Sequence, residues 1–258
     1  MSTQINDCIR LEVAGENALM LYFSSKKSLS NEQKASAITP DFSPVISHDV
    51  HQAVQLIRRH FSVEIIDLIP SYASILVVFN LLEIDHHHLR NKLKKLLQQG
   101  SRESSKEGRL IELPAYYSLE SGMDLSRIAK HAKLSIKQVI NLHQAQEYRV
   151  YAIGFAPGFA YLGEVDERIA MPRLTTPRLK VPKGAIAIAD RQTAVYPAES
   201  PGGWHIIGLC PIDMFNPLAE PTMPIEVGDR VKFVPIDKQQ YLELDGHFSN
   251  KVSLNDYK

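Results

Sequence analysis

The sequence predicts an α+β protein, with a small α/β domain followed by a β-rich domain that is a closed barrel or a sandwich. The first hundred residues alternate between strand-like and helix-like patterns. A polar run, QQGSRESSKEG, then interrupts the apolar periodicity. Beyond it the chain is dense in turns, since twelve of the 15 prolines lie from Pro114 onward. Many short strands between such turns are typical of barrels and sandwiches.

The N-terminal domain is predicted to carry helices on one face of a sheet. Two strands flank the turn Gly15-Glu16-Asn17, and two more flank Pro70-Ser71-Tyr72. Apolar residues at helical spacing, such as Val50, Val54 and Ile57, predict amphipathic helices. We expect strands over residues 8–13 and 18–23, a helix over 50–61, strands over 63–69 and 73–79, and a helix over 84–97.

The polar run marks the predicted domain boundary. Residues 1–99 are assigned to the small α/β domain, residues 100–108 to a linker, and residues 109–258 to the β domain. The break in apolar periodicity is the reason, because a segment without apolar side chains contributes nothing to either core.

The β domain is predicted to begin with a strand and two short helices. The strand covers residues 109–117, and the helices cover residues 124–131 and 135–143, with Asp124 and Ser135 as N-caps. The helix pair has the proportions of a DNA-binding helix-turn-helix, but few of its side chains suit base readout, so two helices that cover a barrel are favoured. The remaining strands are expected over residues 148–153, 184–189, 193–196, 204–209 and 230–234.

Composition is that of an ordinary soluble globular protein. Hydrophobic residues make up 44% of the chain and charged residues 22%. Lys plus Arg and Asp plus Glu each number 29, and this neutral balance argues against nucleic acid as the main partner. Cys8 and Cys210 lie far apart and fit buried thiols in a reducing compartment. Without a signal peptide or a membrane-spanning apolar run, we expect a cytoplasmic protein.

The segment Gly154-Phe155-Ala156-Pro157-Gly158-Phe159 follows a predicted strand. Its glycines permit backbone angles that other residues resist. The segment is either a loop that lines a pocket, with Phe155, Pro157 and Phe159 in contact with a ligand, or a tight barrel corner filled by two aromatic side chains. The local pattern alone favours the corner.

The segment Ser200-Pro201-Gly202-Gly203-Trp204-His205 contains the only tryptophan. Two adjacent glycines allow the backbone to approach another strand or a ligand closely. Exposed amides in such a turn can bind a carboxylate or an oxyanion, and His205 can transfer protons near neutral pH. In the alternative, a bulge turns Trp204 into the core and leaves His205 solvated. The sequence does not separate the two.

A proline-rich run, PRLTTPRLKVPK, lies between these segments. It carries Arg173, Arg178, Lys180 and Lys183 and no acidic residue. Such a run suits an anionic substrate or the acidic face of a partner, although most charge runs are solvated loops.

Several common kinds of site are excluded because the sequence lacks their motifs. The chain has no G-x-x-x-x-G-K-[ST] phosphate loop, no G-x-G-x-x-G, no G-x-S-x-G and no H-E-x-x-H. The run His86-His87-His88 lies at a helix start, where adjacent residues point in different directions. No metal site is therefore predicted.

A long continuous segment of the second domain resembles a known protein family. Residues 148–217, from YRVYAIGFAPGF to CPIDMFNP, resemble the family that contains the B subunit of 5-oxoprolinase, the sporulation kinase inhibitor of Bacillus and allophanate hydrolase subunit 1. The similarity extends more weakly from about Leu110 to the segment EVGDRVKFVPI, and the first hundred residues match mainly in pattern. The resemblance implies a cyclophilin-like β-barrel after a small α/β domain. It also implies a homologous C-type subunit as partner and, in 5-oxoprolinase, a lactam-utilisation subunit, with ATP driving ring opening to glutamate.

The chain departs from the pattern of this family at three places. Tyr117-Ser118 and Gly122-Met123-Asp124-Leu125 stand where relatives carry a YGG-type turn and GPDL. Ala189-Asp190 and Ala194 replace glycines of a GGxQTGIYP segment. Leu209-Cys210 replaces the Arg-Thr of IGRTP, which removes an expected anion contact.

The favoured function is that of a subunit of an ATP-dependent 5-oxoprolinase acting on a small acidic lactam. Inhibition of a histidine kinase and a role in an allophanate or urea-amide hydrolase stay open. The catalytic candidates are Gln192, Tyr196, Glu199 and His205, with Glu199 as a general base. The substrate-binding candidates are Phe155, Pro157, Phe159, Arg178, Lys180, Gly202, Gly203 and Trp204, of which Arg178 and Lys180 would attract a carboxylate or phosphate.

Overall fold

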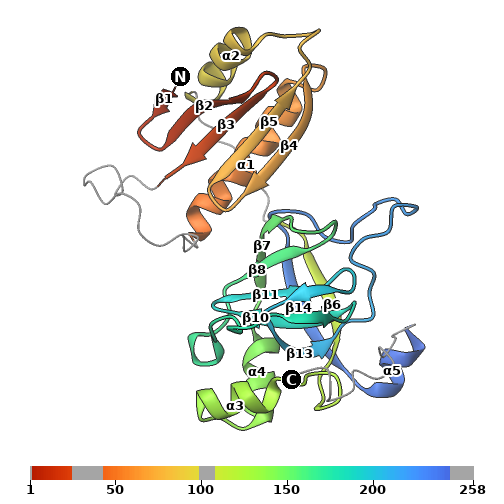
Figure 1. The fold of residues 1–258 in the computed structure, drawn as a ribbon. Coiled ribbons are helices and arrows are strands. Elements are labelled where there is room, and N and C mark those ends of the chain that lie inside the picture. The colour runs from red at the N-terminus through yellow and green to blue at the C-terminus, as the bar shows by residue number, and fades with distance from the viewer. Residues whose placement is uncertain (1, 25–42, 99–107, 245–258) are drawn as a thin grey trace. The chain divides into compact units, whose positions relative to one another are not determined.

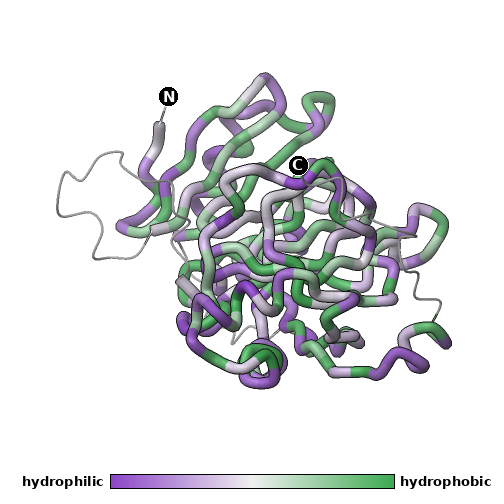
Figure 2. The backbone as a smooth tube through the Cα atoms, turned by 60° about the horizontal axis from the view of Figure 1, so that its bottom comes forward, coloured by the Kyte–Doolittle hydropathy of each residue, from purple (hydrophilic) through white to green (hydrophobic). Residues whose placement is uncertain are grey.

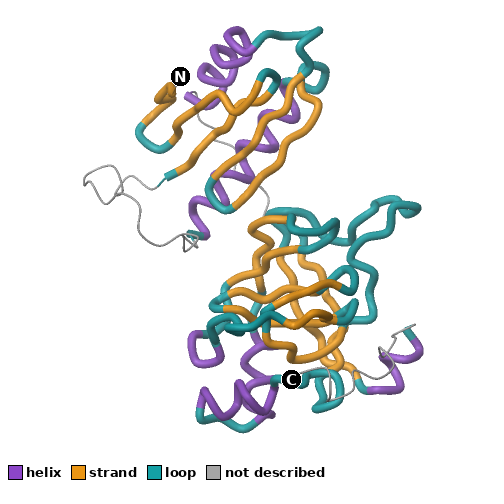
Figure 3. The backbone as a smooth tube through the Cα atoms, in the orientation of Figure 1, coloured by secondary structure: helices purple, strands orange, loops and turns teal. Residues whose placement is uncertain are grey.

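A computed structural model describes residues 2–24, 43–98 and 108–244. The chain divides into two compact units, Met1–Glu107 and Gly108–Lys258 (Figure 1). Each unit contains a β-sheet with helices, and long loops border the second unit (Figure 3). Each unit has its own buried apolar cluster, and the predicted α+β fold is confirmed. No helix in the described ranges has the length and apolar character needed to cross a bilayer.

The first unit is an antiparallel sheet with the strand order β1-β2-β3-β5-β4. Apolar side chains of alternate strand residues, such as Leu19, Leu21, Ile75 and Val77, are fully buried. They share one core with the helices, as expected for helices on one face of a sheet. The elements are β1 (Ser2–Asn6), β2 (Ile9–Gly15), β3 (Ala18–Phe23), α1 (Pro44–His60), β4 (Ile65–Ser71), β5 (Ser74–Phe79) and α2 (His86–Gln98).

Helix α1 begins earlier than its apolar periodicity predicts. Ser43 is its N-cap, because the Ser43 hydroxyl accepts a hydrogen bond from the Ile46 amide at 3.3 Å, and Pro44 follows at a position where proline needs no amide hydrogen. Strand β1 is absent from the sequence prediction. Its residues are mostly polar and pair with only one neighbour, β2, at the sheet edge.

The second unit contains a closed barrel with the order β10-β11-β8-β7-β14-β6-β13, which β13 completes by pairing with β10. The pair β14–β6 is parallel, and the other pairs are antiparallel. The expectation of a barrel is thus confirmed. The barrel strands are β6 (Leu110–Tyr116), β7 (Tyr148–Ile153), β8 (Ala160–Gly163), β10 (Ala185–Ala189), β11 (Gln192–Val195), β13 (His205–Leu209) and β14 (Arg230–Ile236).

Three barrel strands, β10, β11 and β13, are buried on both faces. Larger side chains such as Ile186, Ile188 and Ile207 belong to the main barrel cluster. The alternate residues, among them Ala187 and Ala194, belong to a second cluster with Val181 of the two-stranded ribbon β9 (Arg178–Val181) and β12 (Ser200–Gly202). Hydrophobic and hydrophilic stretches alternate along the coloured part of the backbone tube (Figure 2).

Helices α3 (Leu125–Ala132) and α4 (Ile136–Ala145) lie together at one end of the barrel (Figure 1). Their buried residues Leu125, Ile128 and Val139 belong to the barrel cluster, so the helices cover the barrel as expected. Ser135 caps α4 in a capping box with Gln138.

Asp124 does not cap helix α3, although the sequence predicts it. Its side chain makes no cap hydrogen bond and instead accepts two from the Arg178 guanidinium, at 2.7 and 2.8 Å. The Asp124 carboxylate also accepts a hydrogen bond from the Ile206 amide at 2.7 Å. A buried cation and a buried strand amide together attract this carboxylate more strongly than the amides of its own helix.

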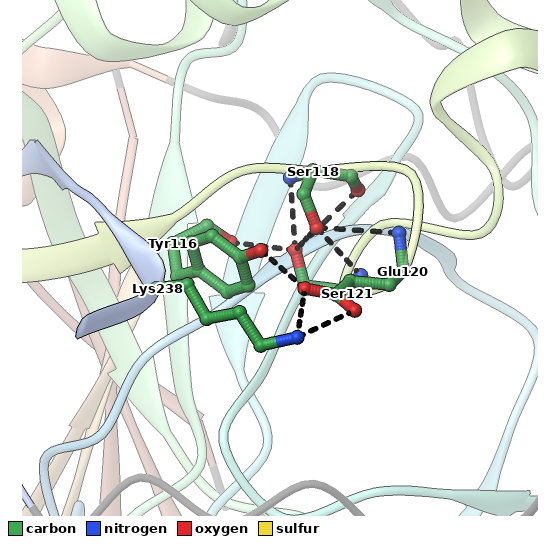
Figure 4. A network of polar contacts seen from close by, with 5 residues as sticks. All are labelled: Tyr116, Ser118, Glu120, Ser121 and Lys238. Atoms are coloured by element: carbon green, nitrogen blue, oxygen red, sulfur yellow. Dashed lines mark hydrogen bonds and ion pairs between the residues drawn. The ribbon is translucent and has the colours of Figure 1, made fainter. Parts of the chain in front are cut away.

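Serine side chains close the turn after β6. The Ser118 hydroxyl accepts hydrogen bonds from the amides of Glu120 and Ser121, and the Ser121 hydroxyl donates to the Tyr116 carbonyl (Figure 4). Glu120 accepts a hydrogen bond from the Tyr116 hydroxyl at 2.5 Å and pairs with Lys238, at the start of α5 (Lys238–Glu243). Serine hydroxyls thus hold this turn by local hydrogen bonds.

Candidate functional site

An aromatic cluster lies on the outer side of the barrel. The segments 154–159 and 200–205 meet there. Phe159 is at its centre. Its ring centroid is 5.3 Å from Phe155, 5.0 Å from Tyr161, 5.2 Å from Tyr196 and 5.7 Å from Trp204. All four contacts are edge-to-face, which is a favourable arrangement for aromatic rings. The structure thus brings together four of the predicted site residues, Phe155, Phe159, Tyr196 and Trp204, and adds Tyr161.

Residues 154–159 form a barrel corner and also expose one aromatic side chain. Phe159 is buried and fills the corner, whereas Phe155 is 67% exposed and Pro157 is exposed. Phe155 has a φ of +73°, in the left-handed region that bulky residues rarely adopt. An exposed aromatic side chain on such backbone is a candidate for ligand contact.

Gly202 and Gly203 serve close packing within the site. A Cβ atom at Gly202 would lie 2.3 Å from the Tyr196 hydroxyl oxygen, so only glycine fits there. The Gly203 carbonyl accepts a hydrogen bond from the Leu174 amide at 2.7 Å. The two glycines therefore let β12 approach the Tyr196 side chain and hold the proline-rich run beside it.

His205 is not solvated, and its ring has a defined tautomer. The residue is 1% exposed, and its Nε2 lies 2.8 Å from the Pro172 carbonyl oxygen. Because a carbonyl oxygen can only accept, Nε2 carries the proton. Nδ1 is buried and has no hydrogen-bond partner in the described part of the chain. His205 fastens residue 172 to the barrel by this bond.

The two tyrosines of the cluster are hydrogen-bond donors at neutral pH. Burial raises the pKa of Tyr196 to about 12, against an opposing effect of the Arg173 charge. Burial likewise raises the pKa of Tyr161, which Arg173 also opposes. Both phenols keep their protons, and both lie close enough to Arg173 to sense its charge.

Three of the four cations in the proline-rich run have acidic partners. Arg178 is bound to Asp124 as described, and its Nη1 also donates to the Trp204 carbonyl at 3.1 Å. Lys180 lies 3.2 Å from Glu199, and Lys183 lies 2.5 Å from Asp213. The Lys180–Glu199 pair is exposed, so Glu199 lies on the surface with a cation as its neighbour.

Gln192 is separate from the rest of the predicted set. It begins β11, pairs with Gly163 of β8 and is buried. Tyr196 follows the other end of β11, so the two Cα atoms are about 13 Å apart along the strand. Arg173 and Tyr161 were not chosen from the sequence as site residues. No local signal distinguishes Arg173 from Arg178, because the distinction depends on Asp124, far away in the chain.

A pocket of about 350 Å³ lies in the first unit, and it shares no residue with the aromatic cluster. Cys8 lines it and is partly exposed, contrary to the prediction of a buried thiol, whereas Cys210 is buried as predicted. The pocket is lined by Asn6, Asp7, Cys8, Ile9, Phe23, Asp49, Gln52, Ala53, Leu56 and Leu97.

Comparisons with known proteins identify relatives along most of the chain. Residues 9–225 match the family described as carboxyltransferase domain, subdomains C and D. The chain is 34% identical to the B subunit of 5-oxoprolinase from Bacillus subtilis, over 90% of this chain and 95% of that protein. It is 45% identical to the B subunit of 5-oxoprolinase from Escherichia coli O157:H7, over 50% of this chain and 59% of that protein.

Solved structures agree with these matches. The protein TTHA0988 has a TM-score of 0.70 and 30% identity over 85% of this chain, which corresponds to 40% of the TTHA0988 chain. The uncharacterized protein PH0987 from Pyrococcus horikoshii has a TM-score of 0.51 and 38% identity, over 90% of this chain and 99% of its own. The Kluyveromyces lactis urea carboxylase shares the fold, with a TM-score of 0.66 and 16% identity over 94% of this chain and 23% of that chain.

Proposed function

Because the chain belongs to the carboxyltransferase-domain family, subdomains C and D, and matches the B subunit of a 5-oxoprolinase nearly end to end, we propose that it is the B subunit of an ATP-dependent 5-oxoprolinase. The complex would open 5-oxoproline to glutamate, together with a homologous C-type subunit and a lactam-utilisation subunit. The end-to-end match with the Bacillus subtilis protein is the observation that carries this proposal.

The chemistry of the reaction explains why ATP is needed. An unstrained lactam is a poor electrophile, because its nitrogen donates electron density to the carbonyl carbon. Transfer of the terminal phosphoryl group of ATP to the carbonyl oxygen releases ADP and makes the carbonyl carbon electrophilic. Water then adds to this carbon, and the ring C–N bond breaks as the protonated nitrogen leaves. A second water hydrolyses the resulting acyl phosphate to the carboxylate and inorganic phosphate. The sequence has no phosphate loop of the standard pattern. We therefore assign the nucleotide step to the assembled complex and no part of it to a particular residue of this chain.

The aromatic cluster supplies groups that suit binding of a small lactam. Tyr196 is buried against Gly202, whereas Tyr161 is partly exposed, and its protonated phenol can donate a hydrogen bond to a carbonyl oxygen. Phe155 offers an exposed apolar face, and Arg173 a positive charge. These contacts would bind and orient a substrate, whereas bond cleavage would use the assembled complex.

Reconstitution tests the proposal. The purified chain is mixed with the C-type and lactam-utilisation subunits, ATP and 5-oxoproline, and glutamate and ADP are measured. We expect release of both products from the complete mixture and a loss of about tenfold or more when this chain is omitted, which corresponds to about 1.4 kcal/mol. Equal turnover without this chain would refute the assignment. In that case the same preparation would be assayed for inhibition of histidine-kinase autophosphorylation.

A further inference from the structure

The backbone on both sides of Arg173 is fastened to the barrel. The Pro172 carbonyl accepts the hydrogen bond from His205, and the Leu174 amide donates to the Gly203 carbonyl. One residue earlier, the Met171 carbonyl accepts a hydrogen bond from the Asp190 amide at 2.7 Å. Residues 171–174 are therefore positioned by three hydrogen bonds, and Arg173 extends from a fixed backbone.

Arg173 differs from the other cations of its run in having no acidic partner. Arg178, Lys180 and Lys183 are each within 3.2 Å of a carboxylate. Among the residues that the structure describes, Arg173 makes neither an ion pair nor a hydrogen bond, and its guanidinium contacts the Trp204 ring. Its guanidinium carbon lies 5.6 Å from the centroid of the indole ring, within cation–π distance.

We propose that Arg173 is the residue that binds the carboxylate of a small substrate at the aromatic cluster. The inference rests on the proposed function for the identity of the substrate as 5-oxoproline, but not for the class of ligand. The guanidinium lies on a buried indole, which holds it in place and leaves its planar fork of donors available for two parallel hydrogen bonds to a carboxylate. Arg178 and Lys180, the candidates that the sequence suggested, are occupied by Asp124 and Glu199.

The surroundings favour a carboxylate over a phosphate group. The neighbours of Arg173 in the cluster are uncharged aromatic side chains, namely Trp204, Tyr161 and Tyr196, whose phenols stay protonated. One guanidinium balances the single charge of a carboxylate, whereas a phosphate group carries more charge and is usually met by several cations or by a ring of amides. The apolar faces suit the ring that carries the carboxylate.

Tryptophan fluorescence tests the proposal on the full chain, because Trp204 is the only tryptophan. A carboxylate that engages Arg173 changes the electrostatic environment of the indole beneath it. The chain is titrated with 5-oxoproline, with 2-pyrrolidinone, which has the ring but no carboxylate, and with inorganic phosphate. We expect a saturable change with 5-oxoproline and at least about tenfold weaker binding of the other two compounds.

Three variants test the site, and one of them is its control. Arg173→Gln should weaken binding of 5-oxoproline by about tenfold or more, and Arg173→Lys should weaken it less, because the charge remains without the fork. Lys183→Gln removes an exposed cation of the same run that pairs with Asp213, and it should bind as the unsubstituted chain does. Binding that is unchanged in Arg173→Gln overturns the proposal, as does equal or tighter binding of phosphate or 2-pyrrolidinone.

The assembled complex separates this proposal from the proposed function. If glutamate release requires the chain, Arg173→Gln should raise the KM for 5-oxoproline about tenfold with a smaller change in kcat, because the lost contact exists in the ground state. Turnover with an unchanged KM overturns the role of Arg173 and leaves the function standing. Carboxylate binding that depends on Arg173, in a complex that does not turn over, overturns the function and leaves the site standing.

Discussion

His143 shows at the scale of one residue how the barrel interior tolerates a polar side chain. It is fully buried, with Nδ1 2.7 Å from the Tyr117 hydroxyl and Nε2 3.0 Å from the Thr193 hydroxyl. The Thr193 hydroxyl donates its own proton to the Ala187 carbonyl. It must therefore accept from Nε2–H, and Nδ1 accepts from Tyr117. Every polar atom of the imidazole is satisfied in the neutral form.

Protonation of His143 should couple folding to pH. Burial lowers the pKa of His143 from 6.5 to about 3. Below about pH 6.5 the unfolded chain binds a proton that the folded chain does not bind, so stability falls as the pH drops toward 3. Between about pH 7 and about pH 5 the loss should be about 2 kcal/mol.

Urea unfolding at both pH values checks this expectation. His143→Gln should be less stable at about pH 7, by about 1–3 kcal/mol, and should lose this part of the pH dependence. His131→Gln, which changes an exposed histidine on α3, should retain it. Identical pH profiles for the unsubstituted chain and His143→Gln would contradict the assignment.

Asp190 lies in the tight turn between β10 and β11 with a left-handed backbone conformation. It stands where the resemblance places a glycine and has a φ of +51°, in the two-residue connection between Ala189 and Gln192. Aspartate tolerates the left-handed region better than most residues, because its short side chain bonds locally.

The effect of a substitution at Asp190 on stability should depend on how well the new residue tolerates a positive φ. Asp190→Gly should leave stability unchanged or raise it by up to about 1 kcal/mol, and Asp190→Val should lower it by about 1–2 kcal/mol. Thermal unfolding of the two variants beside the unsubstituted chain measures both effects. A valine variant as stable as the glycine variant would show that the turn adopts another conformation.

At the scale of elements, the Asp124–Arg178 pair joins helix α3 to the ribbon and to β13. Both side chains are almost fully buried, at 7% and 10% exposure. The Asp124 amide donates to the Ile206 carbonyl while its carboxylate accepts from the Ile206 amide, so one residue pairs with the strand in both directions. This contact fixes where the helix pair meets the barrel.

Breaking this pair should cost stability and leave substrate binding nearly intact. Asp124→Ala leaves a buried guanidinium without its partner, for which we expect a loss of about 3–5 kcal/mol. Arg178→Met should also destabilise, because it leaves the carboxylate unpaired. A double-mutant cycle with both changes measures the coupling, which should exceed about 1 kcal/mol. A large effect of Arg178→Met on the KM for 5-oxoproline, with unchanged stability, would restore Arg178 as a substrate contact.

At the scale of the whole molecule, the two units have separate apolar clusters. The barrel unit has a closed sheet, helices that cover it and a second cluster on its outer face. A unit with its own core is expected to fold independently.

We therefore expect residues 108–258 to fold as an isolated fragment. Calorimetry should show a single cooperative unfolding transition, with agreement between the calorimetric and van't Hoff enthalpies. The fragment should retain the Trp204 fluorescence response to 5-oxoproline. An unfolded fragment would show that the predicted boundary between residues 99 and 109 does not separate independent domains.

Much of the element structure could be predicted, because local patterns encode it. Paired apolar runs around a turn predicted β2, β3, β4 and β5, and apolar periodicity predicted α1 and α2. The elements that were missed are short or lack alternation. Strand β8 has four residues, β12 has three, and β9 lies in a run that reads as a charged loop. Strands β9 and β12 pair with each other although β10 and β11 lie between them in the chain, whereas β8 pairs with its neighbour β7 and with β11.

The sequence by itself determined the α+β class and a β-rich domain that is a barrel or a sandwich, because apolar periodicity, proline and glycine act over a few residues. The family resemblance then favoured the barrel, and four of the five aromatic residues in the cluster were among the candidate site residues. Only the tertiary structure decided which cation in the proline-rich run is available to a ligand. That outcome depends on carboxylates at Asp124, Glu199 and Asp213, and electrostatic partners are chosen by distance in space. Residues that look equivalent in the chain thus acquire different roles once it folds.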